Sequence, residues 1–332
     1  MYYVCPRGQD AASKALAVIK QCVTSPHSLP KTKRSKSARS STCCRFHQNA
    51  LALRFQTNVM SQFIPTNHIT LHAIERGAGD TTLLLMHGLS ANAHCFDGYF
   101  RAGLAEQLRV VTVDLRGRGL SDKPAEGYSM AEHACDIIGL MDASGIGQAV
   151  MGGHSFGALL SIYLARHYPE RVSKLVLIDA AARLHPNVRD MVAPSMQRLG
   201  KIWPSFDAFI AEIKNAPYLT GRWSDEMLPY YRADVYELPD GSVTTYSQLP
   251  HITDAVIKAL SEPWLDFIGT VPQPAILIHA DEPYGPMDGD PILPAEFALE
   301  TVQMMPDCRY VHVPGNHLTM LFGAGALASV QA

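Results

Sequence analysis

The sequence of 332 residues has no long apolar run. Its longest candidates, FGALLSIYLA and the C-terminal LTMLFGAGALASV, are interrupted by Ser, Thr or Gly and fall short of the roughly 18 residues that cross a bilayer. We therefore expect no membrane span. Hydrophobic residues make up 47% of the chain and charged residues 18%, which is ordinary for a globular protein with a large core.

Metal-binding spacings are also missing. The seven cysteines include no C-x-x-C pair, and the 14 histidines include no H-E-x-x-H. Both patterns bring zinc ligands together within a short stretch of chain. We therefore expect reduced thiols, no metal and no cofactor.

Acidic residues are nearly absent from the first 59 positions. Asp10 is the only one, against ten Lys or Arg, so this segment carries a net charge of +9, while the remaining 273 residues carry −12. The segment is rich in serine and has no periodic apolar face from which to build a core. We predict that residues 1–59 form a disordered or transit-like leader and that residues 60–332 form the domain.

Two explanations of this basic leader stay open. Its stretch SLPKTKRSKSARSSTCCR looks like an organellar transit peptide, which would send the protein to a plastid or mitochondrion. The alternative is that Met60 is the true start and the protein is cytoplasmic. In either case the acidic main domain argues against a nucleic-acid partner.

Short apolar runs alternate with helical patterns along the main domain. Seven runs have the length and the endings of strands, at residues 69–77, 82–88, 109–119, 149–155, 174–180, 274–280 and 309–315. Helical spacing of apolar residues marks segments 129–145, 156–172 and 294–307. This alternation predicts an α/β fold with a mostly parallel sheet covered by helices on both faces.

The segment MGGHSFGA, residues 151–158, joins a predicted strand directly to a predicted helix. Ser155 lies at the turn between Gly153 and Gly157. Flanking side chains would collide in so tight a turn, and glycines remove them. The turn would expose the serine hydroxyl near the helix N-terminus, where free N–H groups favour negative charge. We interpret Ser155 as a nucleophile on a nucleophile elbow rather than as part of a plain glycine-rich turn.

From residue 69 to its C-terminus the chain resembles the α/β-hydrolase family. Besides the serine motif, the resemblance rests on three stretches: HGL at 87–89, DLRGRGLSD at 114–122 and VPGNHLTM at 313–320. It implies an α/β-hydrolase fold, with an oxyanion hole formed by the backbone N–H groups of Leu89 and Phe156. Arg116 and Arg118 of the second stretch are expected to set a loop by hydrogen bonds.

A serine hydroxyl needs a general base, and a third group must orient that base. His317 follows the last predicted strand, where the resemblance places the catalytic histidine, although Asn316 precedes it where a small residue is more usual. His87 and His154 adjoin the motifs and are expected to be structural or to line the pocket. We take His317 as the base.

The acid of the triad has three candidates. The resemblance usually places it after the strand at 274–280, where the long loop offers Asp281, counted from the strand, and Asp290, counted back from the next helix. A subset of the family places it at the end of the strand after the nucleophile helix, where Asp179 stands. We favour Asp179 and keep the other two as alternatives, since all preserve the order Ser, Asp, His.

Residues 183 to about 264 take no part in the alternating pattern. All three tryptophans lie there, together with several tyrosines and phenylalanines. The resemblance implies that this insertion is a mostly helical cap over the active site. An aromatic cap would exclude water and wall an apolar pocket, so we expect a small-molecule substrate with an apolar acyl or ring moiety.

Together these features predict a serine hydrolase of the carboxylic ester type. It would cleave a small ester, lactone or thioester through an acyl-enzyme intermediate. One alternative is a hydrolase of carbon–carbon bonds with the same fold, and another is a non-catalytic ligand receptor or scaffold that keeps the fold. No feature of the sequence points to a particular oligomeric state.

Overall fold

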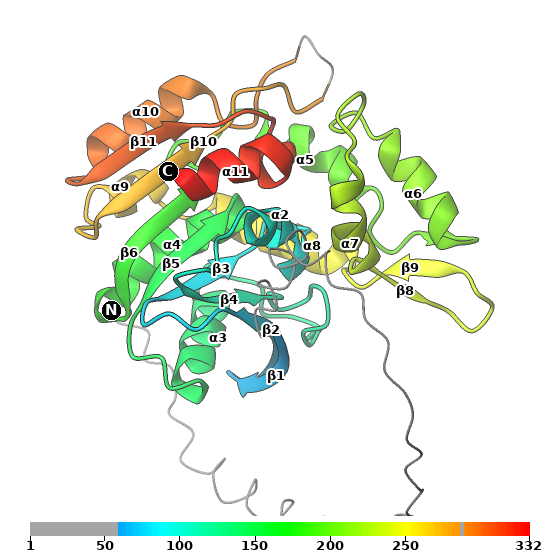
Figure 1. Ribbon diagram of the computed structural model, residues 1–332, viewed down its shortest axis with the longest axis horizontal. Coiled ribbons are helices and arrows are strands. Elements are labelled where there is room, and N and C mark those ends of the chain that lie inside the picture. The colour runs from blue at the N-terminus through cyan, green and yellow to red at the C-terminus, as the bar shows by residue number, and fades with distance from the viewer. Residues whose placement is uncertain (1–58, 286–288) are drawn as a thin grey trace, which may run out of the picture. The chain divides into compact units, whose positions relative to one another are not determined.

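The computed structural model describes residues 59–285 and 289–332. Eight strands form one sheet in the order β1-β2-β4-β3-β5-β6-β10-β11 (Figure 1). Antiparallel pairing is confined to three strands at one edge, β1 (Met60–Thr66), β2 (Ile69–Arg76) and β4 (Arg109–Val113). The others pair in parallel, β3 (Thr82–Met86), β5 (Ala149–His154), β6 (Val172–Ile178), β10 (Ala275–His279) and β11 (Cys308–His312).

The mostly parallel sheet confirms the predicted fold class, and each of the seven predicted runs overlaps a strand. β1 is an addition that the sequence pattern did not predict. It pairs only with β2 and alternates exposed with half-buried residues, so it lacks the continuous apolar run of a central parallel strand. Except for Val59, the predicted leader lies outside the described residues.

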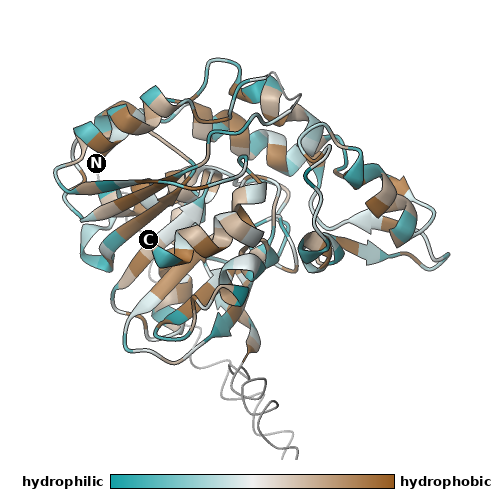
Figure 2. Ribbon diagram, turned by 45° about the horizontal axis from the view of Figure 1, so that its top comes forward, coloured by the Kyte–Doolittle hydropathy of each residue, from teal (hydrophilic) through white to brown (hydrophobic). Residues whose placement is uncertain are grey.

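Helices cover both faces of this sheet because successive side chains of each strand point to opposite sides. Leu84 and Met86 of β3 lie in one buried cluster, with residues from α3 (Met130–Ala143), α4 (Phe156–His167) and α10 (Ala295–Met304). Leu83 and Leu85 lie in the other, with residues from α2 (Asp97–Arg101) and α11 (Gly323–Gln331). Figure 2 shows these apolar strands between the two layers of helices.

Residues 183–264, called the cap below, lie in the chain between β6 and the short helix α9 (Trp264–Ile268) that precedes β10. The cap contains four helices, α5 (Val188–Met196), α6 (Phe206–Lys214), α7 (Leu228–Arg232) and α8 (Leu249–Leu260). It also contains an antiparallel sheet of β7 (Ile202–Trp203), β9 (Val243–Thr245) and β8 (Val235–Glu237). Strands of two or three residues are too short to leave an alternating pattern, so the sequence did not indicate this sheet within the mostly helical cap that the resemblance implies.

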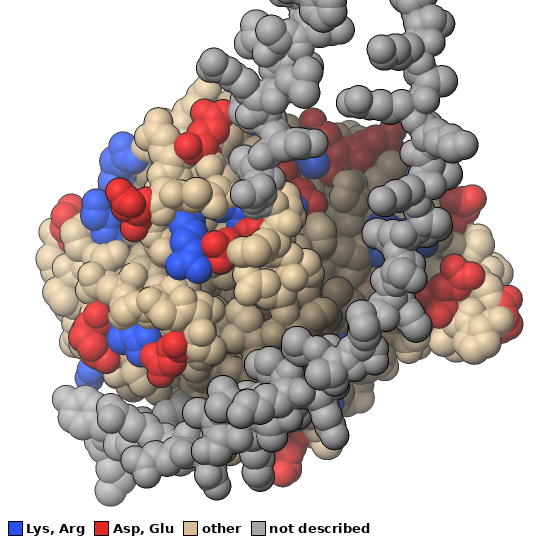
Figure 3. Space-filling model, turned by 60° about the horizontal axis from the view of Figure 1, so that its bottom comes forward, with Lys and Arg blue, Asp and Glu red and all other residues tan. Residues whose placement is uncertain are grey.

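The surface carries charges of both signs. On the face shown in Figure 3, Lys and Arg side chains lie beside Asp and Glu rather than in one large patch of a single sign. Several exposed charges form ion pairs, such as Arg183 with Glu300 and Lys258 with Asp254. Pairs of this kind contribute little to stability. No described helix is both long enough and apolar enough to span a bilayer.

Candidate active site

Ser155 lies between β5 and α4 in a backbone conformation that side chains rarely adopt. Its φ is +54° and its ψ is −115°. The residues two positions before and after Ser155 must be glycines for steric reasons. A Cβ at Gly153 would lie 2.2 Å from the Gly157 carbonyl carbon. A Cβ at Gly157 would lie 1.9 Å from the Met86 carbonyl oxygen. The turn therefore holds the serine in a strained, fixed orientation at the carboxyl end of β5.

Gly157→Ala is expected to destabilise the protein by about 3 kcal/mol or more, because the added methyl meets backbone that cannot move aside. Thermal or denaturant unfolding measures the effect. Gly147→Ala is the matched control, since a Cβ there meets nothing within 4 Å. Similar losses in the two variants would contradict the steric explanation.

His317 and Asp179 form a buried pair beside this turn. The Nδ1–H of His317 donates to Asp179 Oδ2 over 2.6 Å, and both side chains are more than nine-tenths buried. Asp179 follows β6 directly with φ +50°, and its Oδ1 accepts a hydrogen bond from the Ala280 N–H. Because Nδ1 carries the proton, Nε2 of His317 is left as a hydrogen-bond acceptor.

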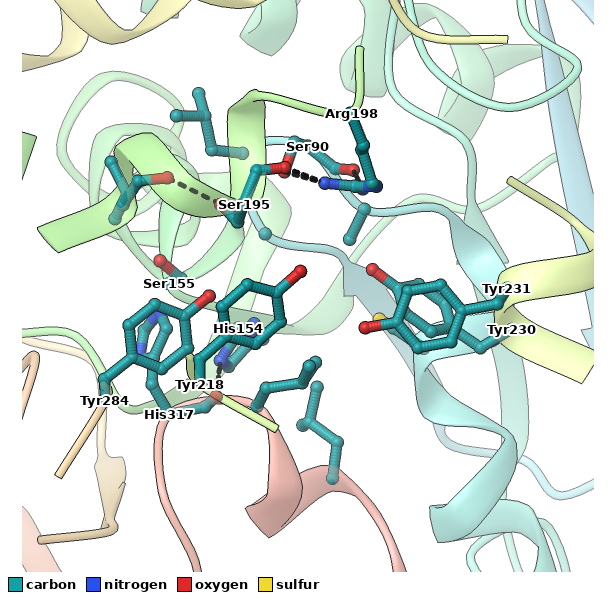
Figure 4. A pocket seen from close by; sticks show the side chains of 17 residues that line it. Ser90, His154, Ser155, Ser195, Arg198, Tyr218, Tyr230, Tyr231, Tyr284 and His317 are labelled. Carbon is teal, nitrogen blue, oxygen red and sulfur yellow. Dashed lines mark hydrogen bonds between the residues drawn. The ribbon is translucent and has the colours of Figure 1, made fainter. Parts of the chain in front are cut away.

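Ser155 and His317 line the same cavity, which Figure 4 shows. The hydrogen bonds found among the described residues include none between the Ser155 hydroxyl and the His317 ring. Hydrogen bonds between a nucleophile and its base are often long before substrate binds. The structure thus brings together the predicted nucleophile, base and acid from three loops at the carboxyl edge of the sheet.

The other acid candidates lie elsewhere. Asp281 accepts a hydrogen bond from His312 Nε2 over 2.8 Å at the protein surface. The Asp290 carboxylate lies 3.7 Å from His185 Nε2, with its side chain 73% exposed. Neither of these aspartates is hydrogen-bonded to His317 among the described residues.

Asn316, which precedes His317, and His154, which precedes Ser155, hold the His317 loop in place by hydrogen bonds. The Oδ1 of buried Asn316 accepts from the backbone N–H groups of Leu318 and Thr319, and its Nδ2 donates to the Tyr218 carbonyl in the cap. The Nε2–H of His154 donates to the His317 carbonyl over 2.6 Å, and burial lowers the pKa of His154 and keeps it neutral. Asn316, the unusual residue before the base, therefore connects the histidine loop to the cap.

The loop of Leu89 is held by hydrogen bonds to its carbonyl groups. Gly88 O accepts from the Nδ1–H of His87 over 2.7 Å and from the Ala91 N–H over 3.2 Å. His87 accepts at Nε2 from the Leu115 N–H, and burial lowers the pKa of His87 to about 4, so its tautomer is fixed. These bonds set the Gly88–Leu89 peptide, whose N–H is the predicted oxyanion donor.

Two buried arginines hold the next two carbonyls of this loop. Arg118 Nε donates to Leu89 O over 3.0 Å, and Arg198 donates to Ser90 O over 2.6 Å. The Arg118 guanidinium also lies over the Phe156 ring, 5.3 Å from its centroid. Phe156 is the first residue of α4, so its N–H has no acceptor within the helix.

Arg198 connects the cap to the loop that follows β3. Its Nε donates to Asp234 Oδ2 over 2.8 Å within the cap, and both side chains are at least nine-tenths buried. The expected loop-setting role of the DLRGRGLSD arginines agrees with these contacts for Arg118 and with the bidentate pairing of Arg116 and Asp136. No local pattern marked Arg198, because its role depends on which buried groups surround it.

Two cavities have Ser155, Leu89 and Val192 in common in their linings. We call one the tyrosine branch, lined by Tyr218, Tyr230, Tyr231, Tyr284, Arg198 and His317. We call the other the aliphatic branch, lined mainly by Leu159, Leu184, Val256, Leu260, Ile292 and Leu293. No cluster of His, Cys, Asp or Glu side chains in the described ranges is placed to hold a metal ion.

A family model for the alpha/beta hydrolase fold matches residues 81–324. The chain therefore belongs to the α/β-hydrolase family and is a hydrolase of the α/β fold. The 2-(acetamidomethylene)succinate hydrolase of Mesorhizobium japonicum is 26% identical over 259 residues, which cover 77% of this chain and 87% of that protein.

Solved structures show the same fold. The crystal structure of E-2-(acetamidomethylene)succinate hydrolase has a TM-score of 0.68 at 24% identity and covers 78% of this chain and 92% of its own. A thermophilic esterase from Thermogutta terrifontis, with malate bound, has a TM-score of 0.62 at 24% identity and covers 82% and 96%.

Proposed function

We propose that the protein is a serine hydrolase that cleaves a small ester, lactone or thioester through an acyl-enzyme intermediate. The observation that carries this proposal is the buried His317–Asp179 pair at the cavity that Ser155 also lines. The strained turn at Ser155 supports it, since such strain is stored mainly at functional sites.

In the first half-reaction Ser155 Oγ attacks the substrate carbonyl carbon while His317 Nε2 takes the serine proton. Asp179 holds the imidazole in the required tautomer and stabilises the cation that forms. The carbon–heteroatom bond then breaks, and the leaving oxygen or sulfur takes the proton from His317. In the second half-reaction a water molecule attacks the acyl-Ser155 by the same steps in reverse, which releases the acid and restores the serine.

The developing oxyanion would be bound by the backbone N–H groups of Leu89 and Phe156. Each such donor contributes about 3 kcal/mol to stabilisation of the transition state when it is held in place. The hydrogen bonds to Gly88 O, Leu89 O and Ser90 O support this assignment, since they restrict rotation of the loop.

Labelling with a fluorophosphonate tests the proposal directly. The reagent is expected to modify Ser155, as located by peptide mass spectrometry, and to abolish hydrolysis of p-nitrophenyl acetate and butanoate. Folded protein that hydrolyses neither ester and carries no label on Ser155 would favour a non-catalytic ligand receptor instead.

Arg198→Lys is expected to lower kcat by about tenfold to a hundredfold with little change in KM, and to lower the thermal midpoint because the hydrogen bond to Ser90 O is lost. Lysine keeps a positive charge beside Asp234 but lacks the fork that reaches Ser90 as well. Displacement of an oxyanion donor lowers the rate of the chemical step and leaves the affinity for the ground-state substrate almost unchanged. Steady-state kinetics with a small acetate ester separates kcat from KM, and an unchanged kcat would rule out this role.

A further inference from the structure

The two branches differ in which of the proposed catalytic and oxyanion-hole residues line them. His317 lines the tyrosine branch and not the aliphatic branch, whereas Phe156 and Asp179 line the aliphatic branch and not the tyrosine branch. The Nδ1 of His317 faces Asp179, which lines the aliphatic branch, and Nε2 lies on the other side of the imidazole ring. The proton that His317 returns is therefore delivered on the side of the tyrosine branch.

This asymmetry fixes the direction of the substrate. The leaving group is the part that must receive the proton from His317 Nε2, so it belongs in the tyrosine branch. The acyl group stays attached to Ser155 after that departure and has only the aliphatic branch left to occupy. The leaving group must therefore fit the lining of the tyrosine branch, and the acyl group must fit the lining of the aliphatic branch.

The aliphatic branch offers an acyl group almost no polar partner. Its walls come from α4, α5, α8 and the segment before α10, with side chains such as Leu159, Val192, Val256 and Leu293. Arg183 and Arg189 also line it, but both are exposed, and Arg183 is paired with Glu300. Burial of methylene groups is the main interaction that this branch supplies.

The tyrosine branch supplies ring faces and hydroxyl donors. The Tyr284 ring lies against His317, with centroids 5.5 Å apart, and the Tyr218 ring stacks on Tyr284. The rings of Tyr230 and Tyr231 lie together farther away (Figure 4). Burial raises the pKa of all four hydroxyls above the usual tyrosine value, so they stay protonated and can donate.

The Tyr230 hydroxyl is available to a ligand. No hydrogen-bond partner for it is found in the described part of the chain, and its side chain lines the branch. The Arg198 charge is balanced by Asp234, so the branch does not select a negative charge.

We infer that the substrate is an ester of an aliphatic acid with a ring-bearing alcohol that carries a hydrogen-bonding substituent, with the acyl chain in the aliphatic branch and the ring in the tyrosine branch. The inference rests on the proposed function. In the balanced reaction the ester and one water give the aliphatic acid and the free alcohol. The bond between the carbonyl carbon and the alcohol oxygen breaks, and that oxygen takes its proton from His317.

A pair of isomeric esters tests the direction. In 2-(4-hydroxyphenyl)ethyl butanoate the hydroxyphenyl ring is on the alcohol, and in propyl 3-(4-hydroxyphenyl)propanoate it is on the acid. Both are alkyl esters of equal composition, so their intrinsic reactivities are similar. We expect kcat/KM to be at least about tenfold higher for the butanoate, the scale on which a fitted pocket discriminates.

Three variants test the branches separately, two in the aliphatic branch and one in the tyrosine branch. Val256→Phe narrows the aliphatic branch and is expected to lower kcat/KM for the butanoate by about tenfold relative to the acetate of the same alcohol. Leu260→Trp is a second narrowing variant in case the first folds poorly, because Leu260 is partly exposed in the same branch.

Tyr230→Phe is the matched change in the other branch. It is expected to leave the preference for butanoate over acetate unchanged and to reduce, by about fivefold, the preference for the hydroxyphenyl ester over 2-phenylethyl butanoate, since one hydrogen bond is lost.

The possible results separate the inferred direction, the substrate class and the proposed function. Faster cleavage of the propyl ester, or an equal effect of the narrowing variants on acetate and butanoate, would overturn the inferred direction. Cleavage of neither isomer by protein whose Ser155 takes the fluorophosphonate would overturn the substrate class and leave the proposed function standing. Absence of labelling in folded protein would instead overturn the proposed function.

Discussion

Replacing Ser155 with alanine is expected to lower kcat for any cleaved ester by about 10⁴-fold or more. Removal of the nucleophile leaves only the oxyanion hole and substrate binding to assist direct attack by water. The fold should survive, because the hydroxyl supports no hydrogen bond found among the described residues, and alanine keeps the same Cβ. Steady-state kinetics and the thermal midpoint measure the two effects.

Ser144→Ala is the control for this experiment, since Ser144 follows α3 at the opposite end of β5. Its kcat should match that of the unmodified protein. If Ser155→Ala retained a tenth of the normal rate, another residue would have to be the nucleophile.

Asp179→Asn is expected to lower kcat by about 10⁴-fold with the fold intact. An asparagine amide would donate to His317 Nδ1 rather than accept from it, which favours the tautomer that cannot take the serine proton. The Asn oxygen can still accept from the Ala280 N–H, so the loss of stability should be small. KM should change far less than kcat because ground-state binding does not depend on the tautomer.

Asp281→Asn and Asp290→Asn are the matched comparisons, and both should keep kcat within about twofold. Asp281 pairs with His312, and Asp290 is exposed near His185, so neither can orient His317 without movement of its loop. A normal kcat in Asp179→Asn together with a large loss in either of the others would show that the loop after β10 supplies the acid.

The central strands could be predicted because they are parallel and buried on both faces, which leaves continuous apolar runs such as LLLM in β3 and LVLI in β6. β1 could not be predicted in this way, because its exposed and half-buried residues alternate, it contains a proline, and it pairs with one neighbouring strand alone. The cap sheet is formed by strands too short to show any period.

The candidate site divides in a similar way. Ser155 was identified by local geometry, because the tight turn imposes glycines at fixed positions. The sequence analysis favours Asp179 as the acid but does not exclude Asp281 and Asp290, since the choice depends on which loop meets His317 in space and not on any spacing along the chain. Arg198 was missed for the same reason: an arginine in an aromatic segment reads as a surface residue until its burial against Asp234 and Ser90 is known.

The left-handed backbone at Ser155 and Asp179 sets a limit on how this protein can be engineered. Each such residue costs about 1 to 2 kcal/mol relative to a relaxed conformation, and glycine would remove that cost. A library screened for heat resistance alone would therefore favour glycine at Ser155, whose hydroxyl has no hydrogen bond among the described residues, and would lose the nucleophile. Asp179 differs, because glycine there would leave the buried Ala280 N–H and His317 Nδ1–H without an acceptor. Selection for durability and selection for turnover oppose each other at the end of β5, so a useful screen must score product formation.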